Sequence, residues 1–389
     1  MRQQVDAIAR RHGLLTSTDG KRLVAALREL SERYNDERPV QPDAVQPSLH
    51  GARLQFSLAR DLPKSREALV ELRHADLLPR RGPIALLDLG AGLGATTLGA
   101  LAALAQAGFS GEVHVTLVEP DAKALELAGQ LVPALAPAGI GVRVTARRET
   151  LESTRALDGP PYDLVLFGQV FSEEARTLEP EARIVRHTDL LERALRNAVK
   201  PGGSLLVVEP ALRVRTRHLH HVRDRLLQRF AATASADYRP VVHSPCPHAG
   251  GCGALAVKTD WCHEDRRVDL PAWLVPIARG AGLRWQGLTF SYLVLRRDGR
   301  TLESSFGAGS RVVSDLRKVK GKSELTLCTE PARLGRLECL DRDAKGPRGE
   351  VWRALERGDL IRVSAAELAR GRLDADSPLV PLHAVGERT

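Results

Sequence analysis

The sequence lacks a long and strongly apolar stretch. Charged residues begin at Arg2 and Asp6, and no apolar block of the signal-peptide type occurs near the N-terminus. No later segment is long and apolar enough to cross a bilayer. We therefore expect a soluble protein of the cytoplasm without a membrane partner.

Cysteine and methionine are also scarce. The chain has five cysteines and one methionine among 389 residues. In a cytoplasmic protein the cysteines are poor candidates for disulfides, which leaves metal binding or buried thiols as their roles. Arginine greatly outnumbers lysine, so the formal net charge of +9 reflects in part a compositional habit.

The basic residues nevertheless gather in two runs. The first run lies on a predicted helix that contains one acidic residue, Asp224. Its basic residues are Arg213, Arg215, Arg217, Arg223, Arg225 and Arg229, with His218, His220 and His221. The second, residues 311–322, contains five basic residues and Asp315. Clustered cations bind phosphates by releasing counterions, so the two runs together favour RNA or a ribonucleoprotein surface. Either run alone is equally typical of a solvated face.

The hydrophobic pattern divides the chain into four segments. Residues 1–80 have apolar residues at helical spacing and predict a helical N-terminal region. Residues 81–240 alternate strand, loop and helix, which predicts a doubly wound, Rossmann-like parallel α/β sheet. Residues 241–300 are a Cys-rich segment with a closing strand, and residues 301–389 suggest a small β-rich unit.

A glycine-rich loop follows the first predicted strand, residues 84–89. Its glycines Gly90, Gly92 and Gly94 let the backbone turn sharply and approach a ligand, and the next helix presents free amide groups. Asp88 precedes the loop. Glu119 ends the next strand, where a carboxylate can accept both hydrogen bonds of a ribose diol. A dinucleotide-binding dehydrogenase would use similar chemistry.

Two later segments favour a methyltransferase instead. Residues 162–168 and 195–209 look like the fourth strand, and the turn with the fifth strand, of class I methyltransferases. We therefore predict that Asp88, Gly90, Gly92, Gly94 and Glu119 bind S-adenosylmethionine. The residues from Gly168 to Phe171 lack the Asn/Asp-Pro-Pro-aromatic pattern associated with exocyclic amine methylation. Methyl transfer needs little more than in-line positioning, so no catalytic residue is assigned.

Three cysteines lie close together among Gly and Pro residues: Cys246, Cys252 and Cys262. Thiolates gathered in this way suit zinc or an iron–sulfur cluster. A zinc site could recruit His248 or His263. An iron–sulfur cluster needs a fourth thiolate, for which Cys328 is the first choice and Cys339 the reserve.

The chain resembles a known family at three motifs, Ser244-Pro245-Cys246-Pro247-His248, Asp260-Trp261-Cys262-His263 and residues 290–297. It is similar there to the mitochondrial small-ribosomal-subunit assembly methyltransferase-like family and its bacterial relatives. The resemblance implies association with small-subunit, 16S-type ribosomal RNA and an S-adenosylmethionine pocket. It also implies a four-iron four-sulfur (4Fe-4S) cluster on Cys246, Cys252, Cys262 and Cys328. The additional Cys339 and the segment after residue 167 depart from the family pattern.

Three functions remain open at this point. The first is a methyltransferase that acts on ribosomal RNA in ribosome assembly. The second is a non-catalytic RNA-binding assembly factor in which S-adenosylmethionine is a structural ligand. The third is a small-molecule methyltransferase with a zinc-stapled insertion. In each case we expect a monomer when the protein is free.

Overall fold

The computed structural model describes residues 1–35, 47–329 and 333–386, which form two compact units. Unit 1 comprises Met1–Glu209 and Arg267–Leu288, and unit 2 comprises Pro210–Arg266 and Thr289–Thr389. These units cut across the four predicted segments, because the helical N-terminal residues share a unit with the first strands and residues 241–300 contribute to both units.

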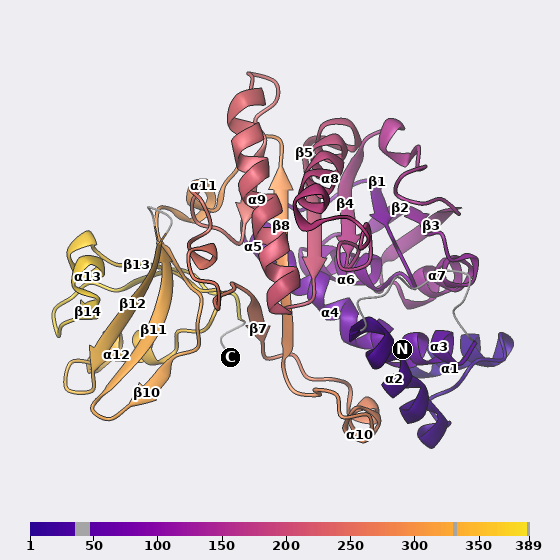
Figure 1. Ribbon diagram of the computed structural model, residues 1–389, viewed down its shortest axis with the longest axis horizontal. Coiled ribbons are helices and arrows are strands. Elements are labelled where there is room, and N and C mark those ends of the chain that lie inside the picture. The colour runs from indigo at the N-terminus through magenta and orange to yellow at the C-terminus, as the bar shows by residue number, and fades with distance from the viewer. Residues whose placement is uncertain (36–46, 330–332, 387–389) are drawn as a thin grey trace. The chain divides into compact units, whose positions relative to one another are not determined.

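Five parallel strands form the centre of unit 1 (Figure 1). They are β1 (Ile84–Leu89), β2 (Gly111–Val118), β3 (Ile140–Arg147), β4 (Tyr162–Gly168) and β5 (Val199–Glu209). Their order is β3-β2-β1-β4-β5, so the chain winds first to one side of β1 and then to the other. Ligands of such sheets bind where the order reverses, outside the carboxyl ends of the strands. The predicted α/β class is confirmed, and this edge lies beyond β1 and β4.

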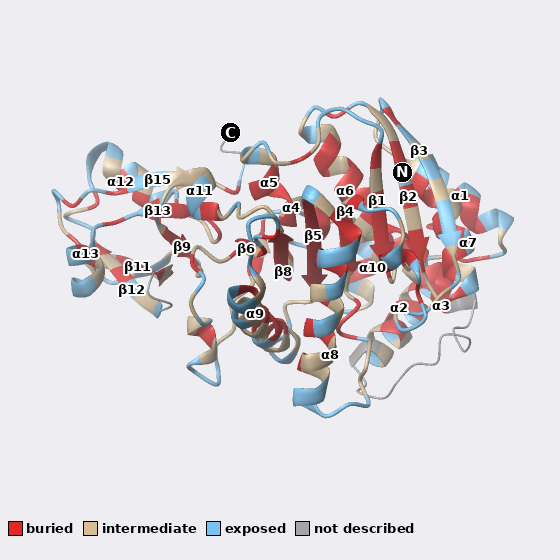
Figure 2. Cartoon of the chain, turned by 90° about the horizontal axis from the view of Figure 1, so that it is seen from above, coloured by how far each residue is buried: buried red, intermediate tan, exposed pale blue. Residues whose placement is uncertain are grey.

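Helices cover the sheet because the chain must cross back after each strand before the next parallel strand can begin, and helices form these crossovers. The helix α6 (Ala95–Gln106) packs against β1 and β4, and α7 (Ala122–Leu135) packs against β2 and β3. Helix α8 (Pro180–Arg193) and a π-helical turn (Ala194–Ala198) lead into β5. The central strands are buried along almost their whole length, while the helices carry exposed outer faces (Figure 2).

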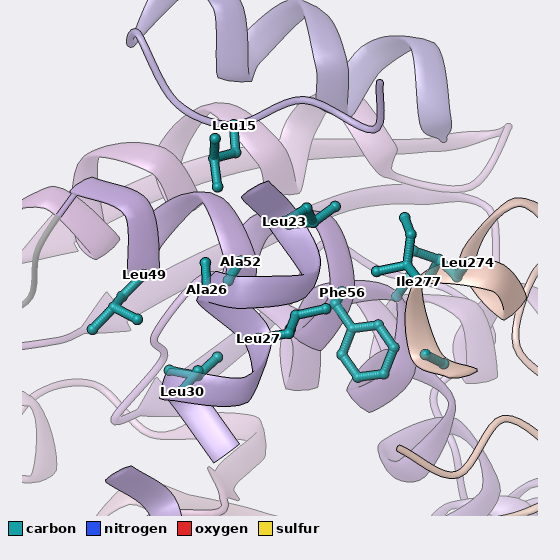
Figure 3. Packing of buried hydrophobic residues seen from close by; sticks show 12 residues of the cluster. Leu15, Leu23, Ala26, Leu27, Leu30, Leu49, Ala52, Phe56, Leu274 and Ile277 are labelled. Atoms are coloured by element: carbon teal, nitrogen blue, oxygen red, sulfur yellow. The ribbon is translucent and has the colours of Figure 1, made fainter. Parts of the chain in front are cut away.

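The N-terminal part of unit 1 is helical, as predicted. It contains α1 (Arg2–Arg11), α2 (Gly20–Asn35), α3 (Pro47–Ala52), a π-helical turn (Arg53–Ser57), α4 (Leu58–Ala68) and α5 (Val70–His74). Helix α4 packs on α6 of the core. Apolar residues of α2, α3 and the π-helical turn pack with α10 (Val275–Gly280) and its preceding turn (Ala272–Leu274), and Figure 3 shows Leu27 and Phe56 within this cluster.

Unit 2 begins with the long helix α9 (Arg213–Thr233). Strand β8 (Leu288–Arg296) pairs with β7 (Glu264–Arg266), and it runs antiparallel to β6 (Val241–Ser244). Residues 245–263, which connect β6 to β7, have one short 3-10 turn (Gly253–Leu255) and otherwise no helix or strand. This connection carries three of the cysteines.

The remaining strands of unit 2 form a second sheet of order β14-β12-β11-β9-β13-β15, with β10 beside β11. They are β9 (Ser310–Val312), β10 (Arg317–Val319), β11 (Lys322–Thr329), β12 (Arg333–Leu340), β13 (Leu360–Arg362), β14 (Arg372–Leu373) and β15 (Val380–His383). Three short helices accompany them: α11 (Leu302–Phe306), α12 (Gly346–Arg353) and α13 (Ala365–Arg370). Trp352 packs with Leu325, Leu327 and Leu337 in the core of this sheet.

Within the described ranges, no helix has the length and apolar character that a membrane span requires.

Candidate cofactor and cysteine sites

The glycine loop lies between β1 and α6, at the carboxyl edge of the unit 1 sheet. All three glycines have positive φ, at 74° for Gly90, 52° for Gly92 and 82° for Gly94. Side chains are strained in this region of φ and ψ, so the loop depends on glycine here. The amides of Gly90 and Ala91 donate to the carbonyl of Val118 at 2.9 and 3.0 Å. The loop is therefore fixed to the end of β2.

Asp88 organises the start of α6. Its side chain is fully buried, and Oδ2 accepts hydrogen bonds from the hydroxyl and the amide of Thr97 at 2.6 and 3.2 Å. Burial raises the pKa of Asp88 to about 7, although the Thr97 hydrogen bonds oppose the rise. In this structure the carboxyl group therefore holds the start of α6 next to the end of β1, on either side of the glycine loop.

Glu119 follows β2 and joins the loop to α7. Its Oε2 accepts from the amide of Gly92 at 2.8 Å, and its Oε1 accepts from the amide of Asp121 at 3.1 Å. Burial raises the pKa of Glu119, and the charge of Arg53 opposes that effect. The carboxylate therefore lies against the loop backbone.

Arg53 and His50 were not identified from the sequence. The Nη1 atom of Arg53 lies 3.5 Å from Oδ2 of Asp121, and Nε2 of His50 lies 3.6 Å from the same oxygen. A Cβ added to Gly92 would meet Nη2 of Arg53 at 3.2 Å. A π-helical turn positions Arg53, and nothing in the local pattern of the sequence marks such a turn.

A second polar group that the sequence did not reveal lies at the end of β4. The side chain of Lys64 is 5% exposed, and its Nζ contacts Oδ1 of Asp61 at 2.8 Å and Oε1 of Gln169 at 3.3 Å. Burial lowers the pKa of Lys64. Burial opposes a fall for Asp61, but the charges of Lys64 and Arg60 lower its pKa overall. The spacing of three residues between Asp61 and Lys64 places both on one helix face, and that spacing is the signal the sequence offers.

The segment after β4 is held rigidly beside the glycine loop. Gln169 has a φ of 60°, which is uncommon for a residue other than glycine and often marks a functional site. A Cβ on Gly90 would meet Cγ2 of Val170 at 2.6 Å. The carboxylate of Glu209 accepts from the amides of Phe171 and Ser172 at 2.9 and 3.0 Å. The segment after β4 thus has a fixed conformation, although it lacks the Asn/Asp-Pro-Pro-aromatic pattern.

Four of the five cysteines approach one another in unit 2. Burial raises the pKa of Cys262 well above its usual value, and the neighbouring Cys328, Cys252 and Cys246 add to the rise. Burial likewise raises the pKa of Cys328 to about 12, with contributions from Cys246 and Cys252. The Sγ atom of Cys328 also lies 3.2 Å from Nε2 of His248. The four thiols are therefore within electrostatic range of one another.

Cys339 has a different environment. It is fully buried in the apolar core of the second sheet, with Leu325, Leu337 and Trp352 in the same cluster. His263 stacks on Trp261 with ring centroids 5.5 Å apart. Across the part of the chain that the structure describes, no three His, Cys, Asp or Glu side chains have the spacing of ligands to one metal ion.

The two basic runs are only partly at the surface, which corrects the expectation from the sequence. On α9, Arg223 is fully buried, His220 is buried, and Arg217 donates to backbone carbonyls. In the second run Arg311 is buried against Glu264 at 2.9 Å and Tyr292 at 3.1 Å. These side chains bond to other groups of the protein, so the number of basic residues in a run overstates its exposed charge.

The comparisons with known proteins include a family model and solved structures. The search of curated proteins found no match to the chain. The solved structures include the plantazolicin methyltransferase BpumL in complex with SAH, at 13% identity and a TM-score of 0.34, covering 72% of this chain and 98% of that chain. They also include the precorrin-6y C5,15-methyltransferase of Geobacter metallireducens, at 11% identity and a TM-score of 0.30, covering 58% and 85%. A third is NSun6 from Pyrococcus horikoshii with SFG, at 14% identity and a TM-score of 0.33, covering 59% and 52%.

The family model is described as Rsm22, mitochondrial small ribosomal subunit Rsm22, and it matches residues 58–362. This range includes the strands β1–β5, the four converging cysteines and most of the second sheet. Because the match covers more than half of the sequence, the chain belongs to the Rsm22 family.

Proposed function

We propose that the protein binds S-adenosylmethionine and acts with small-subunit ribosomal RNA as a methyltransferase. The observation that carries the proposal is the hydrogen bond from the amide of Gly92 to the carboxylate of Glu119 at the carboxyl edge of the sheet. It brings a carboxylate, a loop of glycines with positive φ and the start of α6 to one place. The ribosomal partner is supported by the family description.

The chemistry of this edge suits a charged nucleoside ligand. Glu119 would accept hydrogen bonds from the ribose hydroxyls, while Gly90, Gly92 and Gly94 keep side chains away from the ligand. S-adenosylmethionine supplies an electrophilic methyl group when bound. Asp88 contributes indirectly, because it holds the loop through Thr97.

The acceptor side is less specific, and this keeps a non-catalytic role as the second candidate. Asp61 and Lys64 pair with each other, and Lys64 also donates to Gln169. Their polar groups therefore already have partners, and none is a free base of raised pKa. In the second candidate function, S-adenosylmethionine stabilises unit 1 and the protein assists ribosome assembly without methyl transfer.

We also propose that Cys246, Cys252, Cys262 and Cys328 hold a 4Fe-4S cluster. The donor set supports it, since four partly buried thiols lie within electrostatic range of one another. Zinc on the same residues is the alternative.

The proposed RNA surface lies on the hairpin of β10 and β11 and on the adjoining β12. Its exposed basic residues are Arg317, Lys318, Lys320, Arg333 and Arg336. The buried Glu324 side chain pairs with Arg317 and with Arg336 at 3.4 Å, which neutralises part of this charge. Lys318 and Lys320 are the strongest candidates for phosphate contacts. The proposed compartment is the cytoplasm, although the family description names a mitochondrial subunit, and cell fractionation decides between them.

The first prediction concerns the glycine loop. Gly92→Asp places a charged side chain at a positive φ, beside Glu119, and we expect S-adenosylmethionine affinity to fall at least about 100-fold by titration calorimetry. Gly108→Asp is the matched control, because Gly108 has a φ of 84° and no atom within 4 Å of an added Cβ. Unchanged affinity in Gly92→Asp protein would refute the pocket.

The same pair of variants separates the two candidate functions. If the protein is a methyltransferase, wild type and Gly108→Asp protein transfer labelled methyl groups to small-subunit RNA, and Gly92→Asp protein does not. If wild-type protein binds both the cofactor and the RNA yet transfers no methyl group, the non-catalytic function is correct.

The second prediction concerns the buried Asp88. Its folded-state pKa of about 7 lies above the ordinary value of 3.8, so between these pH values the folded state holds a proton that the unfolded state releases. The unfolding free energy contributed by this group therefore falls as pH rises from about 4 to about 7. Asp88→Asn removes this slope and stabilises the protein at pH 8 by up to roughly 4 kcal/mol. Denaturant unfolding at pH 5, 6.5 and 8 measures it, and parallel curves for the two proteins would contradict it.

The third prediction concerns the cysteines. Protein purified without oxygen should be brown and contain iron, with broad visible absorbance. Alanine at Cys246, Cys252, Cys262 or Cys328 should abolish the colour and destabilise unit 2. Alanine at Cys339 should leave the colour, because that thiol lies in the apolar core. If the wild-type protein is colourless and contains one zinc ion per chain, the site binds zinc and the iron–sulfur assignment is wrong.

The fourth prediction concerns RNA. Replacing Lys318 and Lys320 by alanine should reduce the slope of log affinity against log salt by about 1 per lysine. The double replacement Arg10→Ala and Lys21→Ala, at exposed positions of α1 and α2, is the control of equal charge. If the two double variants have equal slopes of log affinity against log salt, the hairpin is not part of the RNA-binding surface. Equal affinity for small-subunit RNA and unrelated polyanions at moderate salt would refute the ribosomal partner.

A further inference from the structure

Residues 245–263, here called the cysteine segment, have little regular secondary structure but lie partly buried. Buried carbonyl groups need hydrogen-bond donors, and a segment with little helix or sheet supplies few of them from its own backbone. The amides of Leu255, Ala256 and Asp260 donate within the segment, and side chains of α9 supply further donors. Because the cysteine segment carries Cys246, Cys252 and Cys262, these side chains also fix where the three thiols lie.

Arg217 accounts for four of the carbonyl groups. Its Nη1 donates to the carbonyls of Ala254 at 3.1 Å, Val257 at 2.8 Å and Asp260 at 2.8 Å, and its Nη2 donates to Leu255 at 3.2 Å. A guanidinium has five N–H donors in a planar fork, which a lysine cannot match. One side chain therefore holds the stretch between Cys252 and Cys262.

The next turns of α9 hold the two ends of the cysteine segment. His220 bonds through Nε2 to the carbonyl of Cys262 at 3.0 Å. Arg223 donates to the carbonyl of His248 at 2.8 Å and to that of Gly250. Asp224 accepts from the amide of Cys252 at 2.9 Å.

The contacts come from a single helix face. Positions 217, 220, 223 and 224 follow the spacing of three or four residues that brings side chains to one side of a helix. We call Arg217, His220, Arg223 and Asp224 the inner face of α9. Arg213, at the start of the same helix, is exposed and serves as a comparison.

Arg223 differs from Arg217 in its electrostatic setting. Its side chain is completely buried, it pairs with Asp224 at 2.6 Å, and its Nε atom has no hydrogen-bond partner. A buried cation is costly unless negative charge lies nearby. Asp224 supplies one negative charge, and thiolates that bind a metal centre would add to it.

We propose that the inner face of α9 positions the cysteine site, and that Arg223 also stabilises the negative charge of its metal-bound thiolates. The proposal rests on the metal site proposed above. It assigns two separable roles, because Arg217 acts through geometry alone and Arg223 acts through geometry and charge.

The experiment compares Arg217→Gln, Arg223→Gln and Arg223→Lys with the control Arg213→Gln. Metal content and visible absorbance are measured on full-length protein purified without oxygen, and hydrogen–deuterium exchange is measured for residues 245–263. We expect both inner-face glutamine variants to exchange faster in this segment and to bind metal roughly 10–100-fold more weakly. Arg213→Gln should match the wild type. Calorimetric titration with S-adenosylmethionine checks that unit 1 stays folded in each variant.

Arg223→Lys separates charge from geometry, since it keeps the charge and loses the fork. We expect it to exchange as fast as Arg223→Gln but to retain more metal. Equal metal loss in the two Arg223 variants would overturn the charge role. If Arg217→Gln and Arg223→Gln match Arg213→Gln in exchange and metal content, the positioning role is wrong while the metal site stands. If the wild type holds no metal, the metal site and the charge role fail together, and exchange alone then decides the positioning role.

Discussion

Both units depend on one constraint, which is that backbone groups in irregular segments must find hydrogen-bond partners. Unit 1 satisfies amides with carboxylates: Glu119 accepts from Gly92, and Glu209 accepts from Phe171 and Ser172. Unit 2 satisfies carbonyls with cations, chiefly Arg217 and Arg223. The charge of the partner differs because the segments at the strand ends of unit 1 present N–H groups, whereas the cysteine segment presents mainly C=O groups toward α9.

This constraint explains why charge counts from the sequence overstated the basic surface. An arginine that donates to four carbonyls and an arginine that binds phosphate have the same formal charge. The positions on α9 held a clue, because 217, 220 and 223 recur at helical spacing and define a face. The sequence could not show that this face is buried, since burial depends on residues 245–263 folding over it. In the second run, Lys318 and Lys320 near β10 remain exposed.

The sheet and the glycine loop were predictable for a local reason. The first and fourth strands lie at the predicted residues, 84–89 and 162–168, and α6 follows the glycine loop as predicted. Apolar runs between turn residues determine such elements. The Asp61, Lys64 and Gln169 group was not predictable, because it joins a helix of the N-terminal region to the end of β4 across more than a hundred residues. Successive side chains of a strand point to opposite faces of the sheet. Cys339 therefore shares a face with the buried Leu337, whereas Cys328 lies on the face opposite to that of Leu325 and Leu327.

The two proposed sites place different demands on their surroundings. A nucleoside ligand needs open backbone, and glycines with positive φ provide it at a cost in chain entropy, while Asp88 and Glu119 fix the neighbouring residues through hydrogen bonds. A thiolate centre needs fixed ligands and compensating charge, and a buried arginine on a long helix can provide both. Methyl transfer adds a third demand, a nucleophile held in line with the methyl group. The polar side chains at the end of β4 pair with one another, so none of them is free to act as a general base. A methyl acceptor must therefore be nucleophilic without their help, as an RNA base is.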